Sequence, residues 1–283
     1  MNYTQQLDLL IKNALLEDIG EGDHSSLCCI APDAKGTAIL KVKENGILAG
    51  IEIAKKIFTT TQPDILFTSY KKDGDTIIYG DIVFDVKGNV NTILGCERLV
   101  LNIMQRMSGI ATLTREYVEK IKSYHAKVLD TRKTTPNFRV LEKEAVRIGG
   151  GTNHRFGLYD MIMLKDNHID YCGGIENAII KASDYVNTKK KGLRIEVETR
   201  NIEDVKTVMK TGNIDRIMLD NFSVEQITEA MKIINGKYET EASGGITLQN
   251  IESYAATGVD YISCGAIIHH ATSLDLSLKA RLV

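Results

Sequence analysis

The sequence predicts an α/β protein in two parts, an irregular α+β layer followed by a run of β-α units. Over roughly the first hundred residues, short helical and strand-like segments follow one another without a fixed period, which is typical of an α+β layer. Beyond about residue 125, apolar runs that end in polar residues alternate with helical stretches, six times in succession. Such a repeat predicts parallel strands joined by helices.

The first part begins with an amphipathic helix, predicted over residues 7–16. The segment GTAILKVKENGILAG predicts two strands that turn at Asn45-Gly46, because Asn-Gly is favoured in two-residue hairpin turns. A short helix, IEIAKKIFTT, comes next. The strand-like segments FTSY and IIYGDIVFDV complete the layer.

The second part follows a long helical pattern over residues 92–123, which contains Ser108-Gly109 and links the two parts. Its six strand candidates are KVLDTRK, DMIMLKDN, RIEVET, DRIMLDN, ETEASGG and DYISCG. Parallel strands of this kind form either a barrel or an open, doubly wound sheet. No G-x-G-x-x-G opens the first unit, which weakens the dinucleotide-binding version of the open sheet. Six units instead of eight mean that a barrel would be incomplete.

Composition excludes several classes of protein. A net charge of −2 and a pI near 6.3 argue against general nucleic-acid binding, so a basic patch must be local and its ligand small. No run approaches the ~20 apolar residues of a membrane-spanning helix. The five cysteines form no C-x-x-C pair, so we expect free thiols in a reducing cytoplasm. No H-E-x-x-H or similar motif is present, and a transition metal held by the protein is not expected.

Polar side chains end each of the six predicted strands. In a β/α barrel the C-terminal ends of the strands form the active-site face. The strand ends carry Asp130, Arg132 and Lys133; Lys165 and Asp166; Glu196 and Glu198; Asp220; Ser243, Gly244 and Gly245; and Ser263, Cys264 and Gly265. Ionisable residues at the ends of four successive apolar strands indicate a site.

Residues 131–155 gather positive charge in a chain that is weakly acidic overall. A Thr-Pro pair predicts a helix start here. Arg139, Lys143 and Arg147 then recur every fourth residue, on one face of that helix. A charged helix exposed to solvent explains these three residues.

The loops that flank this helix require another explanation. Arg132 and Lys133 precede the helix, and His154 and Arg155 follow a Gly-Gly-Gly segment that lets the chain approach a ligand closely. Arginine offers a planar fork that matches carboxylate or phosphate, and lysine supplies a point charge. We therefore expect a small, multiply anionic ligand that carries phosphate, and His154 is the one histidine expected to act in the site.

The last two predicted units resemble phosphate sites. In ASGGIT, and again in ISCGAI, glycines allow close backbone approach, and the N-H groups of a following helix, with Thr247 near the first start, would face an anion. On the opposing strands, Glu198 and Asp220 suit sugar hydroxyls, a magnesium ion or a cationic transition state.

Eight motifs of the chain resemble those of quinolinate phosphoribosyltransferases, also called nicotinate-nucleotide pyrophosphorylases (carboxylating). They are EDIGEGDHSS, ERLVLNIMQRMSGIAT, DTRKTTPNFRVLEKEAVRIGGGTNHR, IMLKDNHI, VET, MLDNF, EASGGIT and ISCG. They occur in the family's order over nearly the whole chain, and the DTRKTTP, GGGTNHR and KDNH combination is highly specific. Departures are mild: Asn137 replaces a frequent glycine, Glu144 a frequent tyrosine, and GDHSS varies the usual GDIT.

The resemblance implies an N-terminal α/β sandwich domain over residues 1–110 and a C-terminal incomplete α/β barrel, of about six strands, over residues 111–269. Residues 270–283 would pack back on the first domain. The family transfers phosphoribosyl from phosphoribosyl pyrophosphate to quinolinate, with Mg²⁺, and releases pyrophosphate and CO₂ to give nicotinate mononucleotide. The implied protein is therefore a cytoplasmic pentosyltransferase of NAD biosynthesis.

The resemblance also assigns roles to residues at matching positions. The catalytic residues would be Lys133, Lys165, Glu198 and Asp220. Substrates would be bound by these four and by Arg98, Thr131, Arg132, His154 and Arg155, of which Arg132, His154, Arg155 and Lys165 contact quinolinate. Glu198 and Asp220 would hold the ribose and its metal, and the phosphate would lie on Ser243, Gly244, Gly245, Ser263, Cys264 and Gly265. Arg98 would complete a neighbouring subunit's site, which requires a homodimer or a larger oligomer.

Three alternatives remain open at this stage. A paralogous phosphoribosyltransferase, associated with molybdenum transport or specific for nicotinate, would share most of the motifs. An aldolase that forms a Schiff base on Lys165 would need a lysine with a lowered pKa in an apolar strand. A non-catalytic sensor of phosphosugars would bind the ligand without releasing pyrophosphate.

Overall fold

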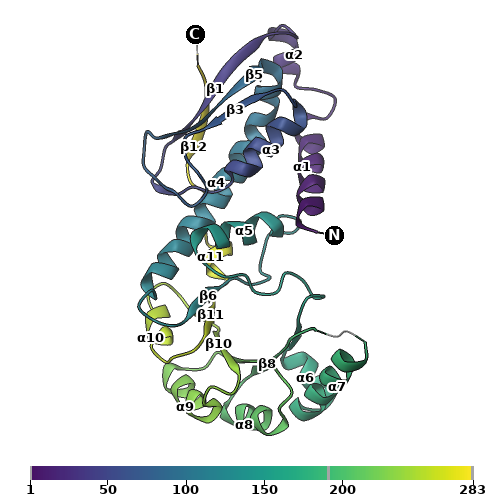
Figure 1. Ribbon diagram of the computed structural model, residues 1–283, viewed down its shortest axis with the longest axis vertical. Coiled ribbons are helices and arrows are strands. Elements are labelled where there is room, and N and C mark those ends of the chain that lie inside the picture. Colours follow the sequence, from purple (N-terminus) through teal and green to yellow (C-terminus); the bar gives the residue numbers. More distant parts are fainter. Residues whose placement is uncertain (1, 190–191, 282–283) are drawn as a thin grey trace. The chain divides into compact units, whose positions relative to one another are not determined.

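The computed structural model describes residues 2–189 and 192–281, which form two compact units (Figure 1). The first unit takes in the described residues up to Arg115, together with Thr134–Gly150 and those from Ile268 onward; the second takes in Glu116–Lys133 and Gly151–Ile267. Residues 134–150 thus group with the first unit, inside the range 111–269 expected for the barrel. Residues 1, 282 and 283 of the predicted domains lie outside the described residues.

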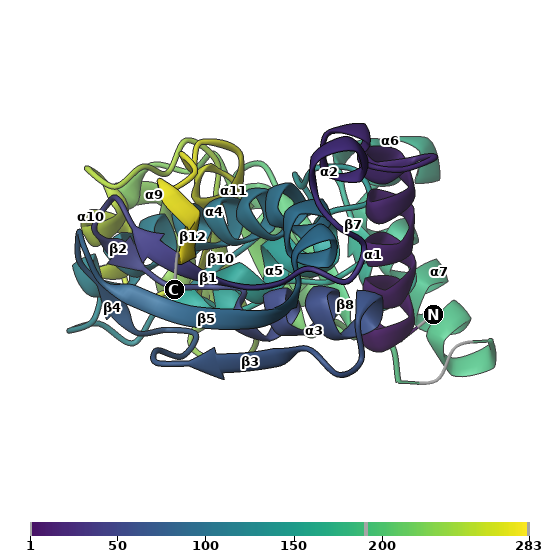
Figure 2. The ribbon, with the colours of Figure 1, turned by 90° about the horizontal axis from the view of Figure 1, so that it is seen from above.

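The first unit contains an antiparallel sheet in the order β12-β1-β5-β3. Its strands are β1 (Lys35–Val42), β3 (Leu66–Ser69), β5 (Ile82–Asn89) and β12 (Leu276–Arg281), and Figure 2 shows β3 at one edge. Ala38, Leu40 and Val42 are buried at alternate positions of β1, which marks one face as the packed face. The C-terminal segment is therefore a strand of the N-terminal sheet.

The predicted hairpin at Asn45-Gly46 is wrong. Strand β2 (Gly46–Ile47) pairs with β4 (Thr76–Ile77), while β1 pairs with β5 and β12. Gly46 is a packing residue: a Cβ atom there would lie 2.6 Å from both the Leu274 Cδ1 and the Thr112 Oγ1 atoms. Residue 46 is therefore a glycine because two other chain segments pack closely against it, and not because it lies in a two-residue turn.

Three of the following four helices of the first unit were predicted, while the one that begins at His24 lies where the sequence predicted a polar loop. They are α1 (Tyr3–Ile19), α2 (His24–Cys29), α3 (Ile51–Thr61) and α4 (Val90–Lys120), the last of which runs on into the second unit. Asn2 caps α1 through the Gln5 N-H, and Asp23 caps α2, so short polar side chains satisfy the free N-H groups at both starts. Helix α4 continues through Ser108-Gly109.

Helix α5 (Arg139–Gly149) differs from the solvent-exposed helix that was predicted. Lys143 is 3% exposed and Glu142 is fully buried, whereas Arg147 is exposed and pairs with Glu144 at 2.6 Å. The Glu142 carboxylate accepts from the Arg106 guanidinium at 2.9 and 3.1 Å and from the Thr135 N-H at 2.8 Å. Charge spacing within α5 could not predict the pair of Glu142 with Arg106, because Arg106 lies on α4.

The second unit is a six-stranded parallel sheet in the order β6-β11-β10-β9-β8-β7. The strands are β6 (Lys127–Leu129), β7 (Ile162–Leu164), β8 (Ile195–Thr199), β9 (Arg216–Asp220), β10 (Glu239–Ser243) and β11 (Tyr261–Ser263). The helices are α6 (Asp166–Cys172), α7 (Ile175–Thr188), α8 (Ile202–Thr211), α9 (Val224–Ile234) and α10 (Ile251–Ala255), and the four-residue α11 (Ala266–His269) begins in this unit. The sheet curves with α8 and α9 on its outer side (Figure 1).

This sheet is the predicted incomplete barrel. The last strand, β11, lies beside the first, β6, which is the order of a barrel and not of an open doubly wound sheet. A parallel bridge between Leu129 and Thr152 extends the sheet beyond β6. Within the described residues, β6 and β7 do not pair, so the barrel is open there. None of the described helices is both long and apolar enough to cross a membrane.

Candidate active site

The carboxyl ends of the six strands lie along one edge of the sheet, because all six strands are parallel. At or just after this edge lie Thr131, Arg132, Lys133, Lys165, Glu198, Asp220, Ser243, Gly244, Gly245, Ser263, Cys264 and Gly265. Asp220 and Ser243 are direct partners in the register of β9 and β10. His154 and Arg155 join this edge because they follow the bridge at Thr152.

The two faces of the central strands differ in chemistry. One face is buried and apolar, with Ile195, Val197, Ile217, Leu219 and Ala242. The other face carries Glu196, Glu198, Arg216, Met218, Asp220 and Glu241. Buried parallel strands are normally apolar on both faces, so the second face, called the interior face below, departs from a packed hydrophobic core.

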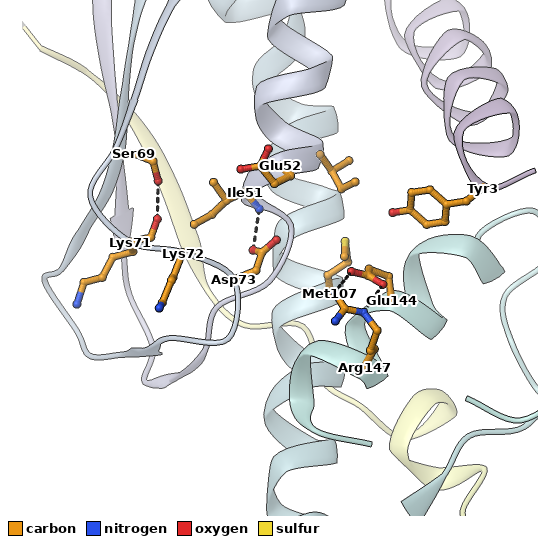
Figure 3. Close-up of a pocket in the computed structure, with 11 residues that line it drawn as sticks. Tyr3, Ile51, Glu52, Ser69, Lys71, Lys72, Asp73, Met107, Glu144 and Arg147 are labelled. Carbon is orange, nitrogen blue, oxygen red and sulfur yellow. Dashed lines mark hydrogen bonds and ion pairs between the residues drawn. The ribbon is translucent and has the colours of Figure 1, made fainter. Parts of the chain in front are cut away.

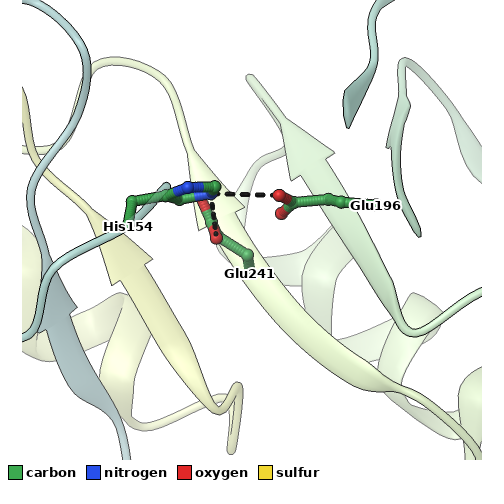
Figure 4. A group of neighbouring side chains, drawn as sticks. All are labelled: His154, Glu196 and Glu241. Carbon is green, nitrogen blue, oxygen red and sulfur yellow. Dashed lines mark ion pairs between the residues drawn. The ribbon is translucent and has the colours of Figure 1, made fainter. Parts of the chain in front are cut away.

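His154, Glu196 and Glu241 meet on the interior face (Figure 4). The His154 Nε2 atom lies 3.0 Å from the Glu196 carboxylate and 3.3 Å from that of Glu241. Arg216, on the strand between them, donates to Glu241 at 2.8 Å and to Glu239 at 3.0 Å. Glu196 and Glu241 are fully buried, and each therefore depends on these cations to remain charged.

The same contacts set the pKa values of the cluster. Burial alone would lower the pKa of His154, but hydrogen bonds and charges from Glu196 and Glu241 raise it to about 9. Burial, followed by the charge of Glu241, raises the pKa of Glu196 to about 7. Burial would also raise the pKa of Glu241, but His154 and Arg216 outweigh it and the pKa is lowered.

The two arginines of the predicted site lie near each other. Burial, and then the charge of Arg132, lowers the pKa of the Arg155 guanidinium. Arg155 donates to the Met161 carbonyl at 3.3 Å and contacts the Met163 sulfur at 3.4 Å, which are weak acceptors for a charged group. The buried Nε of Arg132 has no hydrogen-bond partner among the residues that the structure describes. An anion beside this pair would satisfy both side chains.

Lys165, Glu198 and Asp220 interact at the same edge. Burial, with a further contribution from Asp220, raises the pKa of the half-buried Glu198 carboxyl, and Lys165 opposes that rise. Glu198 accepts from the Asp166 N-H at 3.4 Å, and Asp220 accepts from the Asn221 side chain at 2.7 Å. A cation opposite two carboxylates is the arrangement expected for a reaction that develops positive charge on a sugar.

The glycine loop after β10 has the predicted backbone freedom. Gly244 and Gly245 adopt φ of 92° and 62°, and a Cβ atom on Gly244 would lie 2.1 Å from the Asn221 Oδ1 atom. Only glycine fits both conditions at residue 244.

Of the two predicted phosphate-facing helix starts, the one directly after Gly244-Gly245 is wrong, whereas α11 does begin at Ala266, directly after Gly265. Helix α10 begins only at Ile251 and has five residues, and α11 has four. The Thr247 N-H donates to the Asn250 side chain at 2.7 Å, so it is not presented to a ligand. An Asn-centred turn replaced the first turn of the expected helix, which the Gly-Gly signal does not distinguish from a helix start.

Two predicted residues remain to be placed, and two interior residues were missed. Arg98 is exposed on α4 in the first unit, and the Thr131 hydroxyl accepts from the Lys133 N-H at 3.0 Å. Sequence reasoning did not single out Glu241 or Arg216. The signal was available, since both alternate along their strands with buried residues, which are Ile217 and Leu219 in β9 and Thr240 and Ala242 in β10.

The first unit also contains a pocket of about 470 Å³. Figure 3 shows that some of its charged groups are engaged with the protein: Glu144 pairs with Arg147, and Asp73 accepts from the Ile51 N-H at 2.9 Å. Lys71 pairs with Asp81 at 3.0 Å. No residue of the predicted site lines this pocket, which is therefore a different feature from that site.

The fold and the strand-edge residues together define an α/β barrel enzyme for small anionic substrates. Comparison with protein families identifies it further. The chain belongs to the quinolinate phosphoribosyltransferase family, since the models of that family's N-terminal and C-terminal domains match residues 23–108 and 110–279.

Relatives extend the likeness over almost the whole chain. The mitochondrial quinolinate phosphoribosyltransferase (decarboxylating) 2b of Nicotiana tabacum is 43% identical over 98% of this chain and 82% of its own length. The chloroplastic nicotinate-nucleotide pyrophosphorylase (carboxylating) of Arabidopsis thaliana is 42% identical over 98% of this chain and 83% of its own. The crystal structure of NadC from Streptococcus pyogenes superposes with a TM-score of 0.92, at 40% identity, and the match covers 99% of this chain and 97% of that one.

Proposed function

We propose that this protein transfers phosphoribosyl from phosphoribosyl pyrophosphate to quinolinate and releases pyrophosphate and CO₂, which gives nicotinate mononucleotide for NAD biosynthesis. The observation that carries the proposal is the strand edge. There the Arg132 Nε has no hydrogen-bond partner among the described residues, and the Arg155 guanidinium donates to the Met161 carbonyl and the Met163 sulfur. Lys165 interacts with Glu198 near Asp220. Two arginines suit a dicarboxylic acid, and two carboxylates suit a ribose that becomes cationic.

The reaction follows from these charges. The pyridine nitrogen of quinolinate attacks C1 of the ribose as the bond from C1 to pyrophosphate breaks, and the electron pair leaves with pyrophosphate. In the transition state of this step the ribose is oxocarbenium-like, and Glu198 and Asp220 stabilise its positive charge. The alkylated ring nitrogen then accepts electron density as the adjacent carboxylate leaves as CO₂, and a proton replaces it on the ring carbon. No covalent nucleophile is needed, and positioning supplies much of the rate.

Lys133, Lys165 and the glycine loop complete the proposed site. Lys133 and Lys165 are exposed at the strand edge and would bind acid and pyrophosphate oxygens. Ser243, Gly244 and Gly245, with Ser263, Cys264 and Gly265, would hold the 5'-phosphate. The positive φ values of Gly244 and Gly245 support this role, because a loop built from such glycines lets the backbone approach a ligand closely.

Magnesium fits the same edge. Glu198 and Asp220 offer hard oxygen donors, which Mg²⁺ prefers, and the pyrophosphate of the donor would supply the remaining charge. Bound there, Mg²⁺ would neutralise the leaving pyrophosphate.

We further propose that Arg98 contributes to the active site of a neighbouring copy of the chain. It is exposed on α4 and makes no ion pair within the described residues. A homodimer, or a larger oligomer, would follow.

The test uses purified protein with phosphoribosyl pyrophosphate, Mg²⁺ and either quinolinate or nicotinate. We expect CO₂ and nicotinate mononucleotide in equal amounts from quinolinate. Turnover of nicotinate alone would contradict the proposal, and borohydride trapping of a carbonyl compound on Lys165 would indicate Schiff-base chemistry. Binding of phosphoribosyl pyrophosphate without any release of pyrophosphate would indicate a sensor.

A further inference from the structure

The interior-face cluster holds a segment that carries site residues. Its two carboxylates, Glu196 and Glu241, hold the His154 ring through the Nε2 atom, at 3.0 and 3.3 Å. Asp130, itself fully buried, accepts from the His154 backbone N-H at 2.8 Å and from the Asn153 side chain at 2.7 Å. The segment from Asn153 to Arg155 is thus tied both by its backbone and by the imidazole.

The cluster is too costly to be incidental. Each buried carboxylate loses several kcal/mol of hydration, which a hydrophobic pair of similar size would not lose. Its charges nevertheless balance, because His154 and Arg216 lie against Glu196 and Glu241. The arrangement also resembles a metal site in its ligand types, but Arg216, which donates to the Glu241 Oε2 atom at 2.8 Å, already supplies positive charge that a metal ion would otherwise bring.

The other ring nitrogen of His154 meets the next residue. Its Nδ1 atom accepts from the Arg155 backbone N-H at 2.6 Å. Nε2 therefore faces Glu196 and Glu241, and Nδ1 faces the backbone of Arg155. The guanidinium of Arg155 is the group that the proposed function assigns to the acid substrate. A ring flip would break both sets of contacts, so the carboxylates determine which edge of the imidazole faces Arg155.

We propose, on the basis of the function proposed above, that Glu196 and Glu241 are positioning residues for the acid substrate. They act through His154: by holding Nε2, they fix the imidazole and so hold the segment from Asn153 to Arg155, which presents the Arg155 guanidinium. They touch no substrate. Preorganised cations of this kind bind an anion without a further ordering cost.

The ring's protonation is a direct readout of this anchor. The groups that face His154 are Glu196 from β8, Glu241 from β10, Arg216 from β9 and Asp130 from the end of β6. The carboxylates favour the imidazolium, whereas the Arg155 N-H on Nδ1 favours the neutral ring. An imidazolium carries a proton on Nδ1 and cannot accept from the Arg155 N-H, so below the raised pKa the ring is held through Nε2 alone. Two buried carboxylates outweigh one neutral hydrogen bond of about 1 kcal/mol, in agreement with a pKa raised to about 9.

The experiment compares Glu196→Gln and Glu241→Gln with Glu239→Gln as the matched control. Glu239 lies on the same strand and face as Glu241 and pairs with Arg216 and Arg194, but none of its contacts is with His154. We expect the KM for quinolinate to rise about tenfold in the first two variants, with the KM for phosphoribosyl pyrophosphate changed less than about twofold. The control should alter neither value.

Histidine NMR tests the anchor independently of activity. In the wild-type protein with labelled histidine, the His154 resonance should titrate well above the ordinary histidine value near 6.5, and the neutral ring at high pH should keep its proton on Nε2. Its midpoint should fall in Glu196→Gln and Glu241→Gln. A wild-type midpoint near 6.5 would overturn the proposal even if the variants failed to fold.

Other outcomes are equally decisive. Equal effects on KM in all three variants would show that the cluster has only a structural role. A rise confined to the KM for phosphoribosyl pyrophosphate would contradict the proposal, because the cluster would then position that substrate and not quinolinate. Stoichiometric zinc that chelators remove, with loss of the His154 signal pattern, would show a metal site instead. If the wild-type protein released no CO₂ from quinolinate, the proposed function would fail, while the NMR result would still decide whether the carboxylates anchor His154.

Discussion

Asn137 adopts φ of 62°, the left-handed conformation that few residues other than glycine and asparagine take. Asparagine tolerates this conformation, so it can stand where the resemblance places a frequent glycine. Glu144, the other departure in this stretch, pairs with Arg147 and lines the first unit's pocket. Single residues in this segment thus keep the geometry of the loop while they change its surface.

We expect the charged side chains of residues 131–155 to be of two kinds, those that bind substrate and those that lie on the surface. We expect Arg155→Ala to lower kcat/KM for quinolinate about 100-fold, because a half-buried guanidinium that makes two charged hydrogen bonds to a carboxylate contributes several kcal/mol. Arg147→Ala should change it less than about twofold, since Arg147 is exposed and its pair with Glu144 is a surface pair. Steady-state kinetics measure both, and equal losses would contradict this division.

At the scale of elements, α4 shows why a glycine need not interrupt a helix. A Cβ atom on Gly109 would lie 2.0 Å from the Thr272 carbonyl oxygen, so this glycine admits a neighbouring backbone. Gly95 lies on the same helix and has only an ordinary contact, with Ile19 at 3.7 Å.

These two glycines give opposite predictions. Gly109→Ala should lower the free energy of unfolding by roughly 2–4 kcal/mol, because backbone atoms at Thr272 cannot move aside cheaply. Gly95→Ala should raise it by up to about 1 kcal/mol through helix propensity. Thermal unfolding of the two variants beside the wild-type protein checks both signs, and a stabilised Gly109→Ala would show that the two segments separate easily.

At the scale of the whole molecule, the two ends of the chain share one sheet. Strand β12 pairs with β1 over six residues, from Thr37 opposite Arg281 to Val42 opposite Leu276. The first unit therefore cannot complete its sheet until nearly the whole chain has been synthesised.

Substitutions in β12 test this dependence. Leu278→Asp should destabilise the first unit by about 3 kcal/mol or more, because it buries an unpaired carboxylate at a side chain that is 5% exposed. Lys279→Asp, on the exposed face of the same strand, should change stability by less than about 0.5 kcal/mol. Limited proteolysis and thermal unfolding report both, and equal tolerance of the two variants would mean that β12 is dispensable.

Local pattern determined much of this protein. The six β-α units, the edge at which Lys165, Glu198 and Asp220 meet, and the backbone freedom of Gly244 follow from hydrophobic period, strand direction and residue chemistry, all of which act over a few residues. Partners distant in sequence could not be predicted in this way. Only the tertiary structure placed β12 beside β1, Arg106 against Glu142, and His154 between Glu196 and Glu241. In each case the energy of the contact depends on which strands and helices become neighbours, and that is decided by packing.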